Sequence, residues 1–420
     1  MLLRGGGLLA LANLAAALAN YLFQAVIGRL LTIEQYATVN ALLSITLLAA
    51  APVSAISWSM TKFVAQLAAQ GRLALVASLI GRAALRLLLL FVPAALAWAA
   101  AAPLLGRALQ IRSRGAVLMT LAVLFWTLLR PLVHGSLRGL ERFGVMASSN
   151  VLQPALRVAF AGLLAAAGWG PAGVLLGVAL SLAAATLFSL AFLPPQAPLA
   201  RHHGLPRVEL YRFFWPTLWS MTAYAILAQA DMVAAKAGLA PEQAGYYSAA
   251  ATFARGTLAL IIPLVSVLFP RISLRASGRV RRLELWLVAA VGLFQLLAII
   301  AGKFLAPLLI QLLLGRTPPP AVQLLPLFLA AISPLALASV PIHFRLARGS
   351  RWLAAALMTI AGAYIAALGL FHSSPNRILA CLATAGLAAL VAALSPAAAR
   401  EAPLAAPVSA PRHSAPAAAP

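Results

Sequence analysis

Long apolar runs recur from one end of the chain to the other, and short polar or basic segments separate them. Each run has about 20 residues, the length that a helix needs to cross the hydrocarbon layer of a membrane, which is about 30 Å thick. Runs such as 85–106 show no alternation of apolar and polar positions, so the pattern favours helices over strands. It predicts an all-α polytopic membrane protein with about 12 transmembrane helices, near residues 8–28, 39–60, 85–105, 116–137, 144–167, 172–193, 213–236, 246–269, 285–305, 321–343, 352–371 and 378–395.

The composition agrees with this class and excludes others. The chain of 420 residues is 63% hydrophobic and 9% charged, whereas a soluble domain is about one quarter charged. The net charge of +24 does not indicate nucleic-acid binding, because the basic residues fall mainly between the apolar runs, where they set topology. The single cysteine, Cys381, excludes an intramolecular disulfide and any multi-cysteine metal site. We therefore expect no cofactor and no metal.

The distribution of basic residues predicts the orientation in the membrane. Of the 31 lysines and arginines, 20 fall on the side of the N-terminus and three fall inside spans. The other eight fall on the opposite side, and they are Arg29, Arg107, Arg112, Arg114, Lys236, Lys303, Arg316 and Arg377. Because basic loops stay in the cytoplasm, both termini are expected on the cytoplasmic side. The membrane is expected to be the inner membrane of a bacterium. The basic inner loops are also positioned to contact anionic lipid headgroups.

The spans divide into two halves that show signs of an internal repeat. Each half has a Glu-Gln pair, then a tyrosine, and then a proline 16 residues further on (Tyr36 with Pro52, and Tyr247 with Pro263). The same offset places Asn20 opposite Asp231, the only aspartate. This organisation predicts an N-terminal six-helix lobe, an inter-lobe cytoplasmic loop, a C-terminal six-helix lobe and a disordered Pro/Ala-rich tail, over residues 1–195, 196–212, 213–395 and 396–420.

Four stretches resemble a known group of exporters. They are NYLFQAVIGRLLTIEQYATVNALLSI (Asn20–Ile45), LRGLERFG (Leu137–Gly144), ADMVAAKAGLAPEQAGYYSAAATFARG (Ala230–Gly256) and LLPLFLAAISPLALASVPIHFRLARG (Leu324–Gly349). With the span count, they make the chain similar to the polysaccharide-exporter and lipid-linked oligosaccharide flippase branch of the superfamily that includes the MATE exporters. The resemblance implies two pseudo-symmetric six-helix lobes around a central cavity that opens to either side in turn.

Charged groups within the spans are the candidate site residues, because ionisable groups at membrane depth are costly and are usually paired or functional. Asp231 and Arg255 lie 7 and 10 positions from one predicted hairpin loop, so they could form an internal salt bridge. Lys236 is a weaker candidate partner for Asp231. Alternatively, Asp231 could be a switch coupled to protons or sodium ions.

Arg130 and Arg157 lie in spans of the half that has no acidic residue inside any span. Arg130 could reach the inner surface or pair with Glu141. Arg157 is near the midplane, where a guanidinium without a carboxylate needs carbonyl groups, water or a bound anion, and its planar fork suits phosphate. Asn20 could line the cavity or make an interhelical hydrogen bond. We therefore expect Arg157, Arg130, Arg255 and Asn20 to form the site for an anionic head group.

These features lead to a functional hypothesis with one alternative. The hypothesis is a flippase that moves a polyprenyl-pyrophosphate-linked oligosaccharide from the inner to the outer leaflet, acts as a monomer, and has glycosyltransferases and a glycan polymerase as expected partners. The alternative is a MATE-like cation-coupled drug or metabolite antiporter, which needs a carboxylate that only Asp231 could supply. A metal-dependent membrane enzyme is disfavoured, because the seven acidic residues include no clustered pair.

Overall fold

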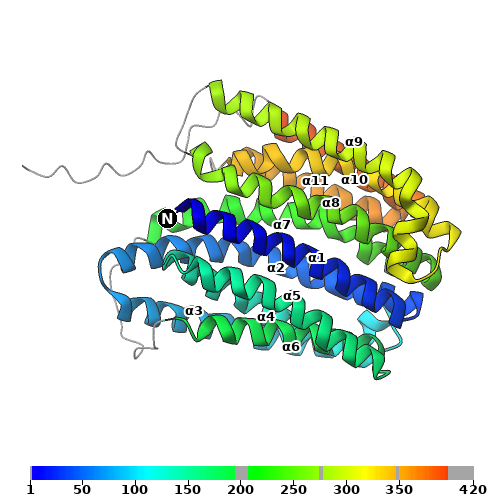
Figure 1. The fold of residues 1–420 in the computed structure, drawn as a ribbon, viewed down its shortest axis with the longest axis horizontal. Helices are drawn as coiled ribbons and strands as arrows, with labels where there is room; N and C mark the ends of the chain where they lie inside the picture. The colour runs from blue at the N-terminus through cyan, green and yellow to red at the C-terminus, as the bar shows by residue number, and fades with distance from the viewer. Residues whose placement is uncertain (1, 194–206, 274–277, 347–349, 396–420) are drawn as a thin grey trace, which may run out of the picture.

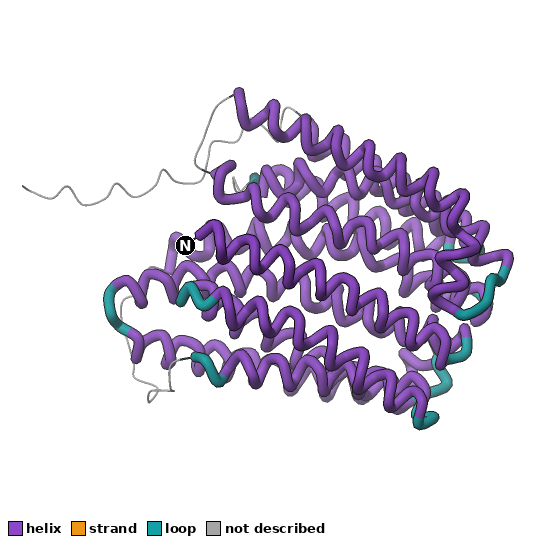
Figure 2. The backbone as a smooth tube through the Cα atoms, viewed as in Figure 1, coloured by secondary structure: helices purple, strands orange, loops and turns teal. Residues whose placement is uncertain are grey.

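The computed structural model describes residues 2–193, 207–273, 278–346 and 350–395. These residues form twelve α-helices and no strand (Figures 1 and 2). The helices are α1 (Leu2–Leu30), α2 (Ile33–Ala69), α3 (Leu73–Ala108), α4 (Arg114–Gly139), α5 (Phe143–Ala166), α6 (Gly170–Leu190), α7 (Arg207–Gly238), α8 (Pro241–Ser273), α9 (Gly278–Leu314), α10 (Pro319–Leu346), α11 (Arg351–Phe371) and α12 (Pro375–Leu394).

The helices are arranged as two six-helix lobes that lie side by side (Figure 1). The N lobe contains α1 to α6, and the C lobe contains α7 to α12. In the N lobe, α2 packs on α4, and α5 packs on both α1 and α6. In the C lobe, α10 contacts α8, α9 and α12, while α7 packs on α11. Each lobe has its own buried apolar cluster. The two-lobe architecture expected from the sequence is confirmed.

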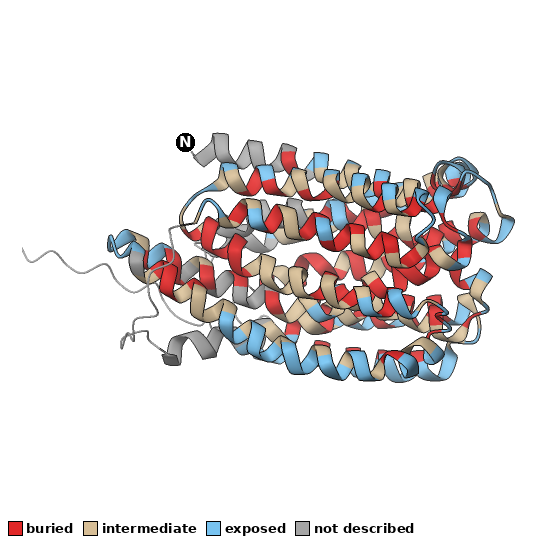
Figure 3. Ribbon diagram, turned by 90° about the horizontal axis from the view of Figure 1, so that it is seen from below, coloured by how far each residue is buried: buried red, intermediate tan, exposed pale blue. Residues whose placement is uncertain are grey.

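Eight helices are long and apolar enough to cross a membrane by themselves, namely α2, α3, α4, α6, α9, α10, α11 and α12. Within the described residues, α1 provides a shorter apolar stretch, Leu14–Leu30. The described parts of α5, α7 and α8 are not apolar enough over the length of a span to be identified by hydropathy alone. Three of these four helices carry Arg157, Asp231 and Arg255, and α1 carries Asn20. The exposed positions lie on the outer faces (Figure 3).

Glycines allow close helix packing in the N lobe, and small residues of this kind are typical of helix interfaces in membranes. Gly135 and Gly139 lie four residues apart on α4. A Cβ atom added at Gly135 would lie 2.5 Å from the Ser57 carbonyl oxygen of α2. One added at Gly139 would lie 2.7 Å from the Thr61 carbonyl oxygen of the same helix. Thr61 also donates its hydroxyl to the Gly135 carbonyl oxygen at 3.1 Å. The backbones of α2 and α4 are therefore in direct contact.

One domain boundary predicted from the sequence is corrected. The sequence assigned residues 196–212 to a loop, but α7 begins at Arg207, so 207–212 are helical. This segment contains no proline or glycine, and the last helix breaker before it is Pro206. The rest of the predicted loop up to 206 and the predicted tail over 396–420 lie outside the described residues.

The lobes are joined at the end of the bundle opposite the N-terminus, which we call the distal end and which contains the connections 31–32, 109–113, 239–240 and 315–318 (Figure 1). The Tyr36 hydroxyl lies 2.8 Å from the Thr252 hydroxyl, and Arg29 donates to the Leu312 carbonyl oxygen at 3.0 Å. Ala37 of α2 lies in the apolar cluster of the C lobe, and Ala249 of α8 lies in that of the N lobe. Among the described residues, every hydrogen bond between the lobes lies in this half.

The substitution Gly139→Ala is expected to destabilise the protein, because the added methyl group would press on the backbone of α2. Overpacking of this kind costs about 1–3 kcal/mol. Gly362→Ala is the matched control, since nothing lies within 4 Å of a Cβ there, and helix propensity favours alanine by about 1 kcal/mol. Thermal melting of the purified protein in detergent should give a lower midpoint for the first variant only. Equal midpoints would contradict the packing interpretation.

Candidate functional site

The charged groups of the C lobe form a closed cluster around Asp231 of α7. Arg255 of α8 donates from Nη2 to Asp231 Oδ1 at 2.5 Å. The Tyr247 hydroxyl donates to the other oxygen, Oδ2, at 2.8 Å. Asp231 and Tyr247 are fully buried. Both carboxylate oxygens are therefore occupied, and the ion pair balances the charge of the aspartate.

The same cluster limits what Arg255 can do for an anionic ligand. Its positive charge is compensated by Asp231, although its Nε has no hydrogen-bond partner among the described residues. The guanidinium carbon lies 6.0 Å from the centroid of the Phe328 ring. Lys236, the weaker candidate partner of Asp231, instead donates from Nζ to the Gln110 carbonyl oxygen at 3.4 Å. Lys236 lies one helical turn nearer the distal end, beyond the reach of the Asp231 pair.

Arg157 lies on α5 where this helix packs against α1. Its Nη2 donates to the Asn20 side-chain oxygen, and its guanidinium carbon lies 4.1 Å from the centroid of the Phe23 ring. Its Nε is buried and has no hydrogen-bond partner among the described residues. No carboxylate lies within ion-pair distance of Arg157 in this part of the chain. Stacking on an aromatic ring orients the guanidinium plane without neutralising its charge.

Arg130 of α4 is held by neutral groups and not by the carboxylate considered from the sequence. Its Nη2 donates to the Ser149 carbonyl oxygen at 3.2 Å and to Asn150 Oδ1 at 3.3 Å, both on α5. Its Nε lies 3.4 Å from His134 Nε2. Glu141 is exposed in the turn between α4 and α5, at a positive φ of 57°, and forms no ion pair with Arg130. Because α5 supplies acceptors at the level of Arg130, the side chain bonds sideways to that helix.

Together these contacts make the two lobes electrostatically different. Neither Arg130 nor Arg157 has an acidic partner among the described residues. The C lobe holds the neutralised pair of Asp231 and Arg255. The N lobe thus presents uncompensated positive charge, whereas the buried charge of the C lobe cancels.

Aromatic side chains of the two lobes meet where α1 contacts α8. Tyr21, next to Asn20 in α1, stacks on Phe253 of α8 with ring centroids 6.0 Å apart. Its hydroxyl also occupies the space that a side chain at Gly256 would need. Of the predicted site residues, the structure joins Asn20 to Arg157 at the contact of α1 with α5. Arg255 instead pairs with Asp231 in the C lobe, and Arg130 bonds from α4 to α5.

Sequence reasoning missed the neutral polar groups that fix these side chains. His134, Ser149 and Asn150 organise Arg130, and Ser44 of α2 donates to Gln229 of α7 at 3.1 Å. The signal was present as the run Ser148-Ser149-Asn150 inside an apolar helix. A second ion pair was also missed, between Arg345 Nη1 and Glu284 Oε1 at 2.8 Å. The described residues contain no group of three potential metal ligands.

Several solved structures share this fold. An inward-facing multidrug resistance MATE family transporter of the MOP superfamily aligns with a TM-score of 0.64 and 14% identity over 90% of this chain and 92% of that chain. The lipid II flippase MurJ, in an inward closed conformation, aligns with a TM-score of 0.69 and 13% identity over 92% and 86% of the two chains. A MOP superfamily transporter from Pyrococcus furiosus, in which reverse polarity of the binding pocket suggests a different function, aligns with a TM-score of 0.63 and 14% identity over 93% and 94%.

The fold is thus that of the two-lobe membrane transporters of the MOP superfamily. A model of the polysaccharide biosynthesis protein family matches residues 2–274, and the chain belongs to that family. No curated protein matches the sequence.

The substitution Asp231→Asn is expected to lower the melting temperature, because it leaves the charge of Arg255 buried without its partner. Removing one member of a buried ion pair costs about 3–5 kcal/mol. The double variant Asp231→Asn with Arg255→Gln should recover most of the loss, since it removes both charges. The melting temperatures of the wild type, the single variant and the double variant are compared in detergent. A single variant that melts like the wild type, yet loses the dependence of transport on a proton or sodium gradient, would instead identify Asp231 as the coupling group.

Proposed function

We propose that this protein is a flippase that moves a polyprenyl-pyrophosphate-linked oligosaccharide from the inner to the outer leaflet of a bacterial inner membrane. Its family supports a role in polysaccharide biosynthesis, and its fold supports transport and not catalysis. The observation that carries the proposal is Arg157, a cation at the contact of α5 with α1, which has a buried unpartnered Nε and no carboxylate within ion-pair distance among the described residues. Such a group is prepared for an anion that arrives with the cargo.

A diphosphate matches this region better than other anions of a glycolipid. A guanidinium binds phosphate oxygens through parallel N–H bonds, and its charge is retained at all relevant pH values. Asn20 accepts from Arg157 through its oxygen, so its NH2 group can donate to the same anion. Arg130 adds positive charge from α4 without being the primary contact, because its N–H groups already bond to α5. Arg255 is assigned a minor role, since Asp231 neutralises it.

The alternative, a MATE-like cation-coupled antiporter, is less well supported by these contacts. It requires a carboxylate that can accept a cation or a proton, and both oxygens of Asp231 already accept hydrogen bonds. The N lobe carries one acidic residue within its helices, Glu34 in the first turn of α2. Coupling to protons or sodium ions through Asp231 would require Arg255 to swing away during the cycle.

The proposed transport cycle is a rocking of one lobe against the other. The bonds between the lobes close the distal end in this conformation, so release on that side requires them to break. In the proposed orientation, with cytoplasmic termini, the distal end faces the outside of the inner membrane. The cargo would come from glycosyltransferases and pass to a glycan polymerase, the protein would work as a monomer, and anionic lipid headgroups would contact its basic inner loops.

The substitution Arg157→Gln should lower transport by about 10- to 100-fold, because a hydrogen bond to a charged group contributes about 1.5–3 kcal/mol. Arg157→Lys should recover part of the rate, since it restores the charge but not the planar fork. The assay is flipping of a fluorescent polyprenyl-diphosphate glycan in proteoliposomes. Arg377→Gln is the control, because Arg377 is exposed at the start of α12. Wild-type flipping by a stably folded Arg157→Gln protein would rule out the anion site.

The orientation is tested with single cysteines, for which one background substitution, Cys381→Ser, is enough. Thr317→Cys lies in the distal connection after α9, and Arg72→Cys lies at the opposite end before α3; both positions are exposed. A membrane-impermeant maleimide added to intact spheroplasts should label the first variant and not the second. The reverse pattern would place the termini outside and reverse the proposed direction of transport.

A further inference from the structure

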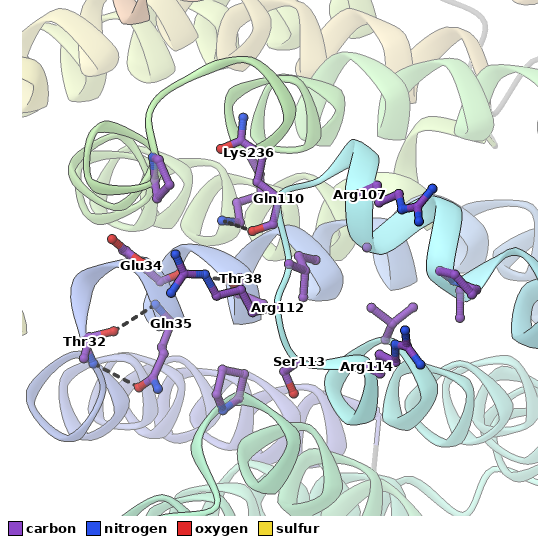
Figure 4. Close-up of a pocket in the computed structure, with 17 residues that line it drawn as sticks. Thr32, Glu34, Gln35, Thr38, Arg107, Gln110, Arg112, Ser113, Arg114 and Lys236 are labelled. Atoms are coloured by element: carbon purple, nitrogen blue, oxygen red, sulfur yellow. Dashed lines mark hydrogen bonds between the residues drawn. The ribbon is translucent and has the colours of Figure 1, made fainter.

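A pocket at the distal end lies apart from the region around Arg157. It has a volume of about 590 Å³ and is formed by the start of α2, the connection between α3 and α4, and the end of α7. Figure 4 shows the basic side chains that surround it, and these are Arg107, Arg112, Arg114 and Lys236. Glu34 is the only acidic residue in its lining. The lining therefore carries an excess of three positive charges.

Three of these four cations have no bonding partner in the described part of the chain. The guanidinium groups of Arg107, Arg112 and Arg114 take part in no hydrogen bond or ion pair with another described residue. Lys236 is 2% exposed, and its ammonium group has one described partner, the Gln110 carbonyl oxygen at 3.4 Å. The negative charge of Glu34, in the same lining, acts on Lys236. The three arginines are therefore the cations of the pocket that have no acceptor among the described residues.

The local backbone makes the same region still more positive. The helix α4 begins at Arg114 with Ser113 as its N-cap, and its first turn contains no acidic residue. Positive side chains at a helix N-terminus are electrostatically unfavourable, whereas an anion there is stabilised by the helix dipole and the free N–H groups. Gln110 has a positive φ of 51° because it lies in the turn that ends α3, where its N–H bonds to the Arg107 carbonyl oxygen and the Ile111 N–H bonds to that of Gly106. In this turn the Gln110 carbonyl oxygen accepts from Lys236.

The placement also runs against the rule that distributes charge in membrane proteins. Basic residues are depleted on the side of the membrane away from the cytoplasm. Eight of them were assigned to that side from the sequence, and four of those eight line this one pocket. Basic residues that only set topology would be expected on the other side and in scattered positions.

We propose that this pocket is a binding site for a phosphate group, and that the bound phosphate holds the two lobes together at the distal end. A phosphate group is favoured because guanidinium groups bind its oxygens through parallel N–H bonds, and because inorganic phosphate also supplies up to two negative charges against the excess of three positive charges. Lys236 and Pro241 belong to the C lobe, and the other lining residues belong to the N lobe. Gln110 joins the lobes by donating from Nε2 to the Ala237 carbonyl oxygen at 3.2 Å and by accepting from Lys236.

The mechanical consequence follows from this division between the lobes. When the distal end opens, Lys236 and the arginines move apart, so the site exists only in the closed state. A ligand that binds one of two states shifts the population toward that state. Without an anion, Glu34 is the one negative charge of the lining, so the closed state lacks the attraction that a bound phosphate would add between the lobes. The phosphate could be inorganic phosphate or the phosphodiester of a lipid headgroup, which carries one negative charge and presents two unesterified oxygens to the same guanidinium groups.

The test uses the full-length protein in nanodiscs, with inorganic phosphate as the probe. In neutral phosphatidylcholine discs, phosphate should raise the melting temperature, and the double variant Arg112→Gln with Arg114→Gln should weaken phosphate binding at least tenfold. These two arginines are exposed, so their loss should not prevent folding. Arg377→Gln should bind phosphate like the wild type. Arg157→Gln should also retain the effect, which separates this site from the proposed cargo site.

A second arm distinguishes the two sources and tests the coupling to closure. Discs with phosphatidylglycerol and no phosphate should stabilise the wild type over the double variant if a lipid headgroup is the ligand. Spin labels at Ala108→Cys and Gln243→Cys, in the Cys381→Ser background, report the distance between the lobes at the distal end; both positions are exposed. The distance distribution should narrow toward the shorter value with either effective ligand. The site is refuted if neither phosphate nor anionic lipid distinguishes the double variant from the wild type, and the closing role is refuted if binding leaves the distances unchanged.

Discussion

The need to satisfy every polar group inside the bilayer governs the structure. Water is absent from the hydrocarbon layer, so a charged side chain within a helix requires partners in the protein, a water-filled cavity or a bound ligand. Arg130 bonds to the Ser149 carbonyl oxygen and to Asn150, and Arg255 bonds to Asp231. These bonds fix the rotation of α4 against α5 and of α7 against α8. The polar residues, although few, thereby set the register of an otherwise apolar bundle.

The same requirement gives the lobes different properties from a shared plan. The repeat places Asn20 opposite Asp231, yet Asn20 is exposed and touches Arg157, whereas Asp231 is fully buried and paired. Tyr36 and Tyr247 are both fully buried, but the first bonds across to Thr252 of the other lobe and the second bonds to Asp231 within its own lobe. One lobe has become a closed electrostatic unit, and the other keeps unbalanced charge toward the interface.

Sequence alone anticipated the features that depend on local register. The span pattern predicted twelve helices in two lobes. The positions of Asp231 and Arg255 along one hairpin suggested an ion pair, and the structure places Arg255 Nη2 2.5 Å from Asp231 Oδ1. Features that depend on helix rotation were not accessible. The contact of Arg130 with Asn150 requires the facing sides of α4 and α5, and the contact of Lys236 with Gln110 joins residues 126 positions apart. The loop boundary was misplaced because helix α7 extends past its apolar part to Arg207.

The apolar clusters of the two lobes share residues at the distal end, and this sharing determines what opening that end requires. Ala37 of α2 lies in the cluster of the C lobe, whereas Ala249 of α8 and Ile310 and Leu313 of α9 lie in that of the N lobe. Separating the lobes there would expose these core side chains, at about 25 cal/mol for each Å² of apolar surface. The distal contact is thus a continuous piece of hydrophobic core, and its separation exposes apolar surface as well as breaking hydrogen bonds.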